Sequence, residues 1–166
     1  MSRLDTNIDR LVAQRACLDA LVDALAELPG PVVELGLGNG RTFDHLRERL
    51  PQREIFVFER QPAAHPDCRP DPDHLIVGDF FDTLPGALAR LPGPAALVHA
   101  DVGTGDRARN ARLARWLAGA IPPLVAAGGY VAADQALEDP RLTPLPLPPV
   151  VPVGRYHLYR RGPDGR

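Results

Sequence analysis

Residues 32–42 read VVELGLGNGRT, a short apolar run followed by glycines at three alternate positions. The run Val32–Leu35 is typical of a strand that is buried on both faces of a parallel sheet. The glycines allow a tight turn and let a ligand approach the backbone where a side chain would clash. The helix predicted at Thr42–Leu50 directs its first amide groups at that ligand, which favours a carboxylate or a phosphate. The stretch therefore predicts a strand, a ligand-binding loop and a helix.

The glycine spacing separates two kinds of nucleotide site. Gly36, Gly38 and Gly40 form G-x-G-x-G, whereas the dinucleotide fingerprint needs G-x-G-x-x-G and position 41 is arginine. The spacing counts against a nicotinamide-dependent oxidoreductase, which we keep as the least favoured functional alternative.

Short apolar runs alternate with helical stretches along the rest of the chain. The predicted strands after the glycine loop are Ile55–Phe58, Leu75–Val77, Ala95–Ala100, Tyr130–Ala133 and 155–161, with a helix at Arg107–Ala120. Two proline-rich stretches break the rhythm: 61–74 predicts an irregular crossover, and 140–152 has room for an edge strand at most. This alternation is typical of an α/β fold, a Rossmann-like, doubly wound and mostly parallel sheet with helices on both faces.

A further helix is predicted before the sheet, from Asp5 to Leu28, where Pro29-Gly30-Pro31 ends it. Its apolar residues fall on one face, Leu4, Ile8, Leu11, Leu18, Val22 and Leu25. Arg15 lies on that stripe, which favours a lid helix whose Arg15, or the adjacent Gln14, reaches an anionic group of the ligand. Cys17 is predicted to lie away from the stripe. The 166 residues are thus predicted as one domain, 1–166, with a lid helix (1–28), a cofactor-binding core (32–135), a proline-rich segment (140–152) and a final strand (155–161).

Acidic residues follow the predicted strands at the edge where open α/β sheets bind ligands. Glu59 follows the second strand and is placed to accept hydrogen bonds from both hydroxyls of a ribose. Asp79 follows the third strand and precedes Phe80, so its carboxylate can accept from an adenine amino group. Asp101 ends the fourth strand. Each acid alone is weak evidence, but their order along the chain indicates a nucleoside site.

With these features, the chain resembles the class I S-adenosylmethionine-dependent methyltransferases from about Val32 to Ala133. It is most similar to a small family of short bacterial methyltransferases that share VELGLGNGRT (33–42), HADVGTGD (99–106) and an N-terminal helix. The resemblance implies a seven-stranded sheet whose last strand is antiparallel. It implies binding of S-adenosyl-L-methionine, with S-adenosyl-L-homocysteine as the product.

The resemblance also implies roles for individual residues. The methionine half of the cofactor would be wrapped by Glu34, Gly36, Leu37, Gly38, Asn39, Gly40 and Thr42, and reached by Arg15. Glu59 would hold the ribose, and Asp79 and Phe80 the adenine. Arg60 stands where many relatives have an apolar residue, so its guanidinium is expected to stack on the adenine ring.

Asp101 is also the candidate catalytic base, because methyl transfer to a hydroxyl or a protonated amine releases a proton. His99, two residues earlier, is interpreted as a buried histidine that hydrogen-bonds the backbone. Asp101, Asp134 and Gln135 resemble the metal ligands of the catechol-type O-methyltransferases, so Mg²⁺ is an alternative, although no metal site is favoured.

Composition excludes several classes of protein. All 19 basic residues are arginine, which rules out a catalytic or P-loop lysine, and Ser2 is the one serine, which argues against a serine hydrolase. The net charge of −2 argues against a nucleic-acid or membrane-surface partner.

The arginine bias suggests a GC-rich bacterial genome, and the lack of an apolar leader or a membrane-spanning run predicts a cytoplasmic protein. We therefore expect a methyltransferase with a small-molecule acceptor; a non-catalytic binder of the cofactor is the second alternative, and a homodimer stays open.

Overall fold

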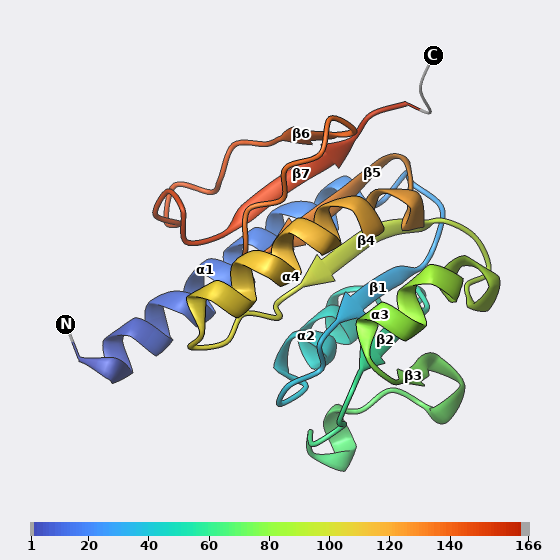
Figure 1. Cartoon of the computed structure of the whole chain (residues 1–166), viewed down its shortest axis with the longest axis horizontal. Coiled ribbons are helices and arrows are strands. Elements are labelled where there is room, and N and C mark those ends of the chain that lie inside the picture. Colours follow the sequence, from blue (N-terminus) through green and yellow to red (C-terminus); the bar gives the residue numbers. More distant parts are fainter. Residues whose placement is uncertain (1, 164–166) are drawn as a thin grey trace.

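The computed structural model describes residues 2–163 and has three layers, with helices on both faces of one sheet (Figure 1). Within these residues the strands form a seven-stranded sheet of order β3-β2-β1-β4-β5-β7-β6. The strands are β1 (Val32–Leu35), β2 (Ile55–Glu59), β3 (Leu75–Val77), β4 (Ala95–Ala100), β5 (Val125–Ala133), β6 (Leu142–Pro144) and β7 (His157–Arg161). Neighbours among β1–β5 are parallel, and β7 is antiparallel to both β5 and β6. The predicted doubly wound sheet with an antiparallel last strand is confirmed.

The helices are divided between the two faces of the sheet. α1 (Arg3–Ala24) and α2 (Arg41–Arg49) cover one face, and α3 (Phe80–Thr83), η3 (Leu84–Arg90) and α4 (Arg107–Ala120) cover the other (Figure 1). The central strands β1 and β4 are buried along their whole length, which explains their unbroken apolar character. The short turns η1 (Pro66–Cys68), η2 (Pro72–His74) and η4 (Pro122–Leu124) complete the described chain.

The strand order reverses between β1 and β4, which lie side by side at the centre of the sheet. The segments that leave their carboxyl ends run to opposite faces, so a crevice opens between them. The glycine loop follows β1, and Asp101 follows β4. The topology therefore brings both predicted features to one point.

α1 differs from its prediction in its end and in its buried face. It ends at Ala24, and only its C-terminal half packs on the sheet, while the N-terminal turns extend past the body of the protein (Figure 1). Leu4 and Ile8 of the predicted stripe are 67% and 49% exposed, whereas Cys17 is fully buried. The buried face of α1 thus includes Cys17, which the sequence places away from the stripe, and burial raises the pKa of its thiol to about 11. Leu18, Val22 and Leu25 of the stripe are buried as predicted. Its N-terminal half is exposed, because periodicity gives the phase of a helix but not how much of it meets the sheet.

Arg53 closes the turn that ends α1. Its guanidinium donates to the carbonyl oxygens of Leu25 (2.9 Å), Leu28 (2.8 Å) and Gly30 (2.6 Å). The Leu25 carbonyl also accepts from the amide of Leu28 (3.0 Å). The guanidinium thus helps to satisfy the carbonyls between the end of α1 and the start of β1.

We expect Arg53→Ala to lower the free energy of unfolding by about 2–4 kcal/mol, because charged hydrogen bonds to three carbonyls are lost together. Urea denaturation checks this value. Arg90→Ala is the matched control, since Arg90 is exposed and its side chain makes no hydrogen bond or ion pair with the described residues; we expect a change below about 0.5 kcal/mol. Equal stability of the two variants would show that these hydrogen bonds contribute nothing.

The two proline-rich stretches are as predicted. Residues 61–74 form loops and two short 3-10 turns, and 140–152 contains only the edge strand β6. β5, in contrast, begins at Val125 rather than at the predicted Tyr130. Gly128 and Gly129, which resemble a turn in the sequence, lie inside this strand where its register with β4 shifts. Among the described residues, no helix has the length and apolar character needed to cross a membrane.

Candidate functional site

The glycine loop connects β1 to α2 and has the backbone conformation that its sequence predicts. Gly36, Gly38 and Gly40 have φ values of 89°, 51° and 76°, which L side chains rarely adopt. A Cβ on Gly40 would lie 2.2 Å from the carbonyl oxygen of Cys68, so glycine is also required there for space. The loop therefore holds its amide groups and the start of α2 in one fixed arrangement.

Glu59 ties this loop to the end of β2. One carboxylate oxygen accepts from the amides of Leu37 (2.8 Å) and Gly38 (3.4 Å), and the other accepts from the amide of Gln61 (2.8 Å). The side chain is thus at the glycine loop, where the ribose prediction needs it. It also helps to shape the loop, a second role that the sequence did not indicate.

Glu34 lies beneath the loop. Its side chain is fully buried and accepts a hydrogen bond from the hydroxyl of Thr42 in the first turn of α2. One of its oxygens, Oε2, has no hydrogen-bond partner. The contact joins β1 to α2, so Glu34 supports the loop from inside the protein, while Thr42 is partly exposed.

The predicted adenine residues gather at the ends of β2 and β3. Asp79 caps α3 by accepting from the amide of Phe81 at 3.1 Å. The guanidinium of Arg60 lies 3.9 Å from the other Asp79 oxygen and is largely exposed. Phe80 is partly buried against the core. An exposed cation, a carboxylate and an aromatic ring thus border one rim of the sheet edge.

Asp101, after β4, meets α1 rather than open solvent. Its Oδ2 accepts from the side-chain amide of Gln14, and its Oδ1 lies 3.7 Å from the guanidinium of Arg10. Arg15, the predicted lid residue, is exposed and borders a groove between α1 and α2 that shares Leu11, Gln14, Arg41 and Thr42 with the cavity at the glycine loop. The polar residues that α1 brings to Asp101 are therefore Gln14 and Arg10. The sequence analysis named Gln14 as the alternative to Arg15, but it did not predict a role for Arg10.

Asp134 is partly buried beside Asp101. Its two oxygens accept from the amides of Val102 (3.2 Å) and Gly103 (2.8 Å), and Gln135 donates to it at 3.1 Å. Burial, and then the charge of Asp101, raise the pKa of Asp134. These donors use the oxygens that the Mg²⁺ alternative requires. In residues 2–163, no group of three or more His, Cys, Asp or Glu side chains is placed to hold a metal ion.

Glu34, His99 and Tyr156 form a buried polar cluster beneath the ends of the central strands. The sequence predicts that His99 hydrogen-bonds the backbone, and this prediction is wrong. The Nε2 of His99 contacts the hydroxyl of Tyr156, and its Nδ1 lies 3.6 Å from Glu34. Gln14 hydrogen-bonds Asp101. Burial, followed by the charges of the two aspartates, raises the pKa of Tyr156 well above its usual range, so the phenol stays protonated and can donate to His99.

Two adjoining cavities follow from this geometry. The first has a volume of about 210 Å³ and is lined by Arg10, Leu11, Gln14, 36–39, Arg41, Thr42, Asp101 and Gly103. The second has about 460 Å³ and is lined by Arg10, Gly103, Thr104, Asn110, Asp134, Gln135 and 152–156. Arg10 and Gly103 border both. A wider hollow of about 620 Å³ lies around Arg53, at the opposite edge of the sheet, and contains none of the predicted site residues.

The residues that line the first cavity could hold the methionine half of S-adenosyl-L-methionine. Glycine-loop amides can receive its carboxylate, and Asp101 and Gln14 offer oxygen atoms to its ammonium group. The nucleoside half would extend along the sheet edge toward Glu59 and Asp79, which lie at the ends of the neighbouring strands.

Comparisons with known proteins agree with this geometry. A crystal structure of an S-adenosyl-L-methionine methyl transferase from Silicibacter pomeroyi DSS-3 is 50% identical, covers 98% of this chain and 99% of that chain, and superposes with a TM-score of 0.92. MycE methyltransferase of the mycinamycin pathway, in complex with Mg and SAH, is 16% identical over 88% of this chain and 45% of its own, with a TM-score of 0.59. The sugar N-methyltransferase KedS8 from Streptoalloteichus sp. is 20% identical over 80% of this chain and 53% of its own, with a TM-score of 0.50.

The last two structures share the fold alone. A search of curated proteins gave no match. Residues 1–161, however, match the family described as S-adenosyl-L-methionine methyltransferase. This match and the 50% identical structure favour the methyltransferase over the nicotinamide-dependent alternative. The chain belongs to the S-adenosyl-L-methionine methyltransferase family and is a class I S-adenosylmethionine-dependent methyltransferase.

Proposed function

We propose that this methyltransferase holds its cofactor along the glycine loop and methylates a small-molecule acceptor in the second cavity. The observation that carries the proposal is the junction of the two cavities at Arg10 and Gly103, beside Asp101. The volume of about 460 Å³ lies in the usual range for small-ligand sites. The net charge of −2 gives no support to a nucleic-acid acceptor.

The residues around the cofactor have separate roles in this proposal. The loop amides receive the methionine carboxylate, and Glu59 receives the ribose hydroxyls while keeping its contact with the loop. Asp79 and Phe80 hold the adenine, with Arg60 over the ring. Glu34 acts from below through its contact with Thr42, which itself lines the first cavity.

The chemistry needs positioning more than covalent catalysis. Bound S-adenosyl-L-methionine supplies an electrophilic methyl group on a sulfonium. A bond forms between the acceptor atom and the methyl carbon while the carbon–sulfur bond breaks, so the sulfur becomes a neutral thioether. Alignment of donor and acceptor supplies most of the acceleration. Asp101 is placed to take the proton that an acceptor hydroxyl or ammonium releases, and Gln14 and Arg10 orient its carboxylate.

The test is a transfer experiment with labelled cofactor. The full chain is incubated with methyl-labelled S-adenosyl-L-methionine and a bacterial extract separated into dialysable compounds, protein and nucleic acid. We expect the label in the dialysable fraction, and we expect Asp101→Asn to slow the transfer. Label in protein or nucleic acid alone would contradict the small-molecule acceptor, and saturable cofactor binding with no transfer would favour the non-catalytic alternative.

A further inference from the structure

The second cavity contains polar side chains that are satisfied by one another. Asn110 accepts from the amide of Thr104 (2.8 Å) and from its hydroxyl (3.0 Å), and donates back to the carbonyl of Thr104 (2.7 Å). Both oxygens of Asp134 face backbone amides. These groups shape the wall of the cavity, but their hydrogen bonds are already made within the protein.

Arg155 differs from these residues in that its side chain has no partner among the described residues of the cavity. It belongs to the segment between β6 and β7, is partly buried, and lines the second cavity. Its side chain makes no hydrogen bond or ion pair with any residue in the range 2–163. Of the other charged side chains there, Asp134 is held by amides and Arg10 lies 3.7 Å from Asp101. The cavity thus contains one guanidinium without a counter-ion.

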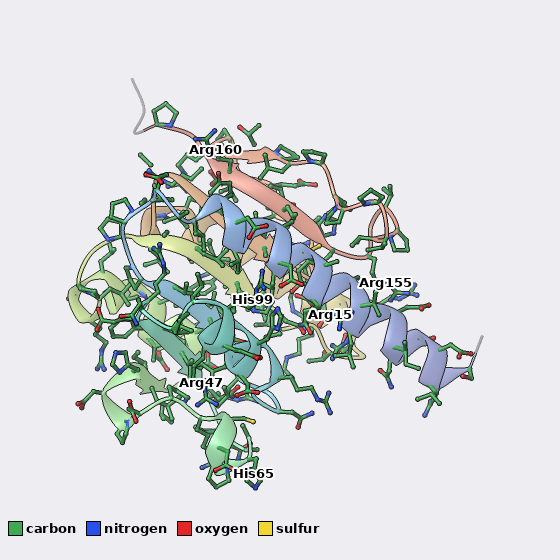
Figure 2. The ribbon with its side chains drawn as sticks, turned by 180° about the vertical axis from the view of Figure 1, so that it is seen from behind. Arg15, Arg47, His65, His99, Arg155 and Arg160 are labelled. Carbon is green, nitrogen blue, oxygen red and sulfur yellow. The ribbon has the colours of Figure 1, made fainter. Side chains whose placement is uncertain are left out.

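Two separate segments bring arginines to this cavity. Arg10 comes from the extending part of α1, and Arg155 from the loop before β7, which lies beside α1 (Figure 2). A guanidinium matches the planar or tetrahedral oxygens of a carboxylate or phosphate with two parallel hydrogen bonds. An anion between them would neutralise the charge of Arg155 and join the two segments over the cavity.

We propose that the acceptor carries an anionic group, a carboxylate or a phosphate monoester, that binds Arg155 with Arg10 beside it. The atom to be methylated then lies toward Gly103 and Asp101, where the cavities join. The inference rests on the proposed function, in that it takes the second cavity as the acceptor site. It narrows the acceptor from any small molecule to one bearing an acid at the end opposite its nucleophile.

Matched probes test the charge requirement. Benzoate and phenyl phosphate carry the anion, and benzamide has the shape of benzoate without the charge. Titration calorimetry with the full chain, with and without S-adenosyl-L-homocysteine, should show binding of at least one anion and none of benzamide. Arg155→Gln should weaken anion binding about 10- to 100-fold, as expected for the loss of charged hydrogen bonds. Arg115→Gln is the control, because Arg115 is exposed on α4 and does not line the cavity.

Each outcome bears on the proposal. Equal binding of benzoate and benzamide, unchanged binding to Arg155→Gln, or no binding of either anion would overturn it. Failure of S-adenosyl-L-homocysteine to bind is a separate result and would contradict the proposed cofactor site. For the acceptor recovered in the transfer experiment, amidation of its acid should raise KM for the wild type and leave Arg155→Gln unaffected, and an acceptor without an acid would also overturn the proposal.

Discussion

Replacing Glu59 with alanine should weaken the binding of S-adenosyl-L-methionine and S-adenosyl-L-homocysteine by about 100-fold or more. The variant loses two charged hydrogen bonds to the ribose, each worth about 1.5–3 kcal/mol. It also loses the carboxylate that accepts from the amides of Leu37 and Gly38. The glycine loop is then less ordered before the cofactor binds, and the cofactor must supply that order.

Titration calorimetry measures this effect, with Glu54→Ala as the matched control. Glu54 lies next to the opposite end of the same strand, is exposed, and contacts His74 at 3.3 Å. Its removal should leave cofactor affinity unchanged. An affinity of Glu59→Ala within a few-fold of the wild type would remove Glu59 from the cofactor site.

Replacing Gly40 with alanine should destabilise the folded chain by about 2–5 kcal/mol. The left-handed backbone alone costs about 1–2 kcal/mol for a residue with a Cβ, and forcing a methyl group into a packed region costs about 1–3 kcal/mol more. At Gly40 that methyl would lie 2.2 Å from the Cys68 carbonyl oxygen, so either α2 or the loop 61–74 must shift. A drop in melting temperature of about 2–4 °C for each kcal/mol should accompany the change.

Gly38→Ala separates the two causes. Gly38 also has a positive φ, 51°, but a Cβ there meets no atom within 4 Å. Only the backbone cost of about 1–2 kcal/mol should remain. Urea denaturation of both variants gives the comparison, and equal losses of stability would show that the contact with Cys68 has no energetic weight.

The sequence predicted the fold well because its signals are local. Buried runs such as Val32–Leu35 and Ala95–Ala100, the glycine loop and the prolines each determine a few adjacent residues. The connectivity rules for parallel strands then leave few arrangements. The acids of the candidate site were predicted for the same reason, since Glu59 ends β2, Asp101 directly follows β4 and Asp79 lies two residues after β3.

The remainder of the site depends on contacts between distant segments. Gln14 and Asp101 are 87 positions apart, and His99 and Tyr156 are 57 apart. No local pattern indicates that α1 would bring Gln14 and Arg10, rather than Arg15, to the end of β4. One signal was available: Arg155 and Tyr156 are adjacent at the start of the predicted final strand, with two residues between them and the proline-rich segment.

The most direct test of the account is titration of the purified full chain with S-adenosyl-L-methionine, S-adenosyl-L-homocysteine and NAD. The account predicts saturable binding of the first two at one site per chain, lost in Glu59→Ala, and no binding of NAD. Binding of NAD alone, or binding of the first two that survives removal of Glu59, would contradict a cofactor site at the glycine loop.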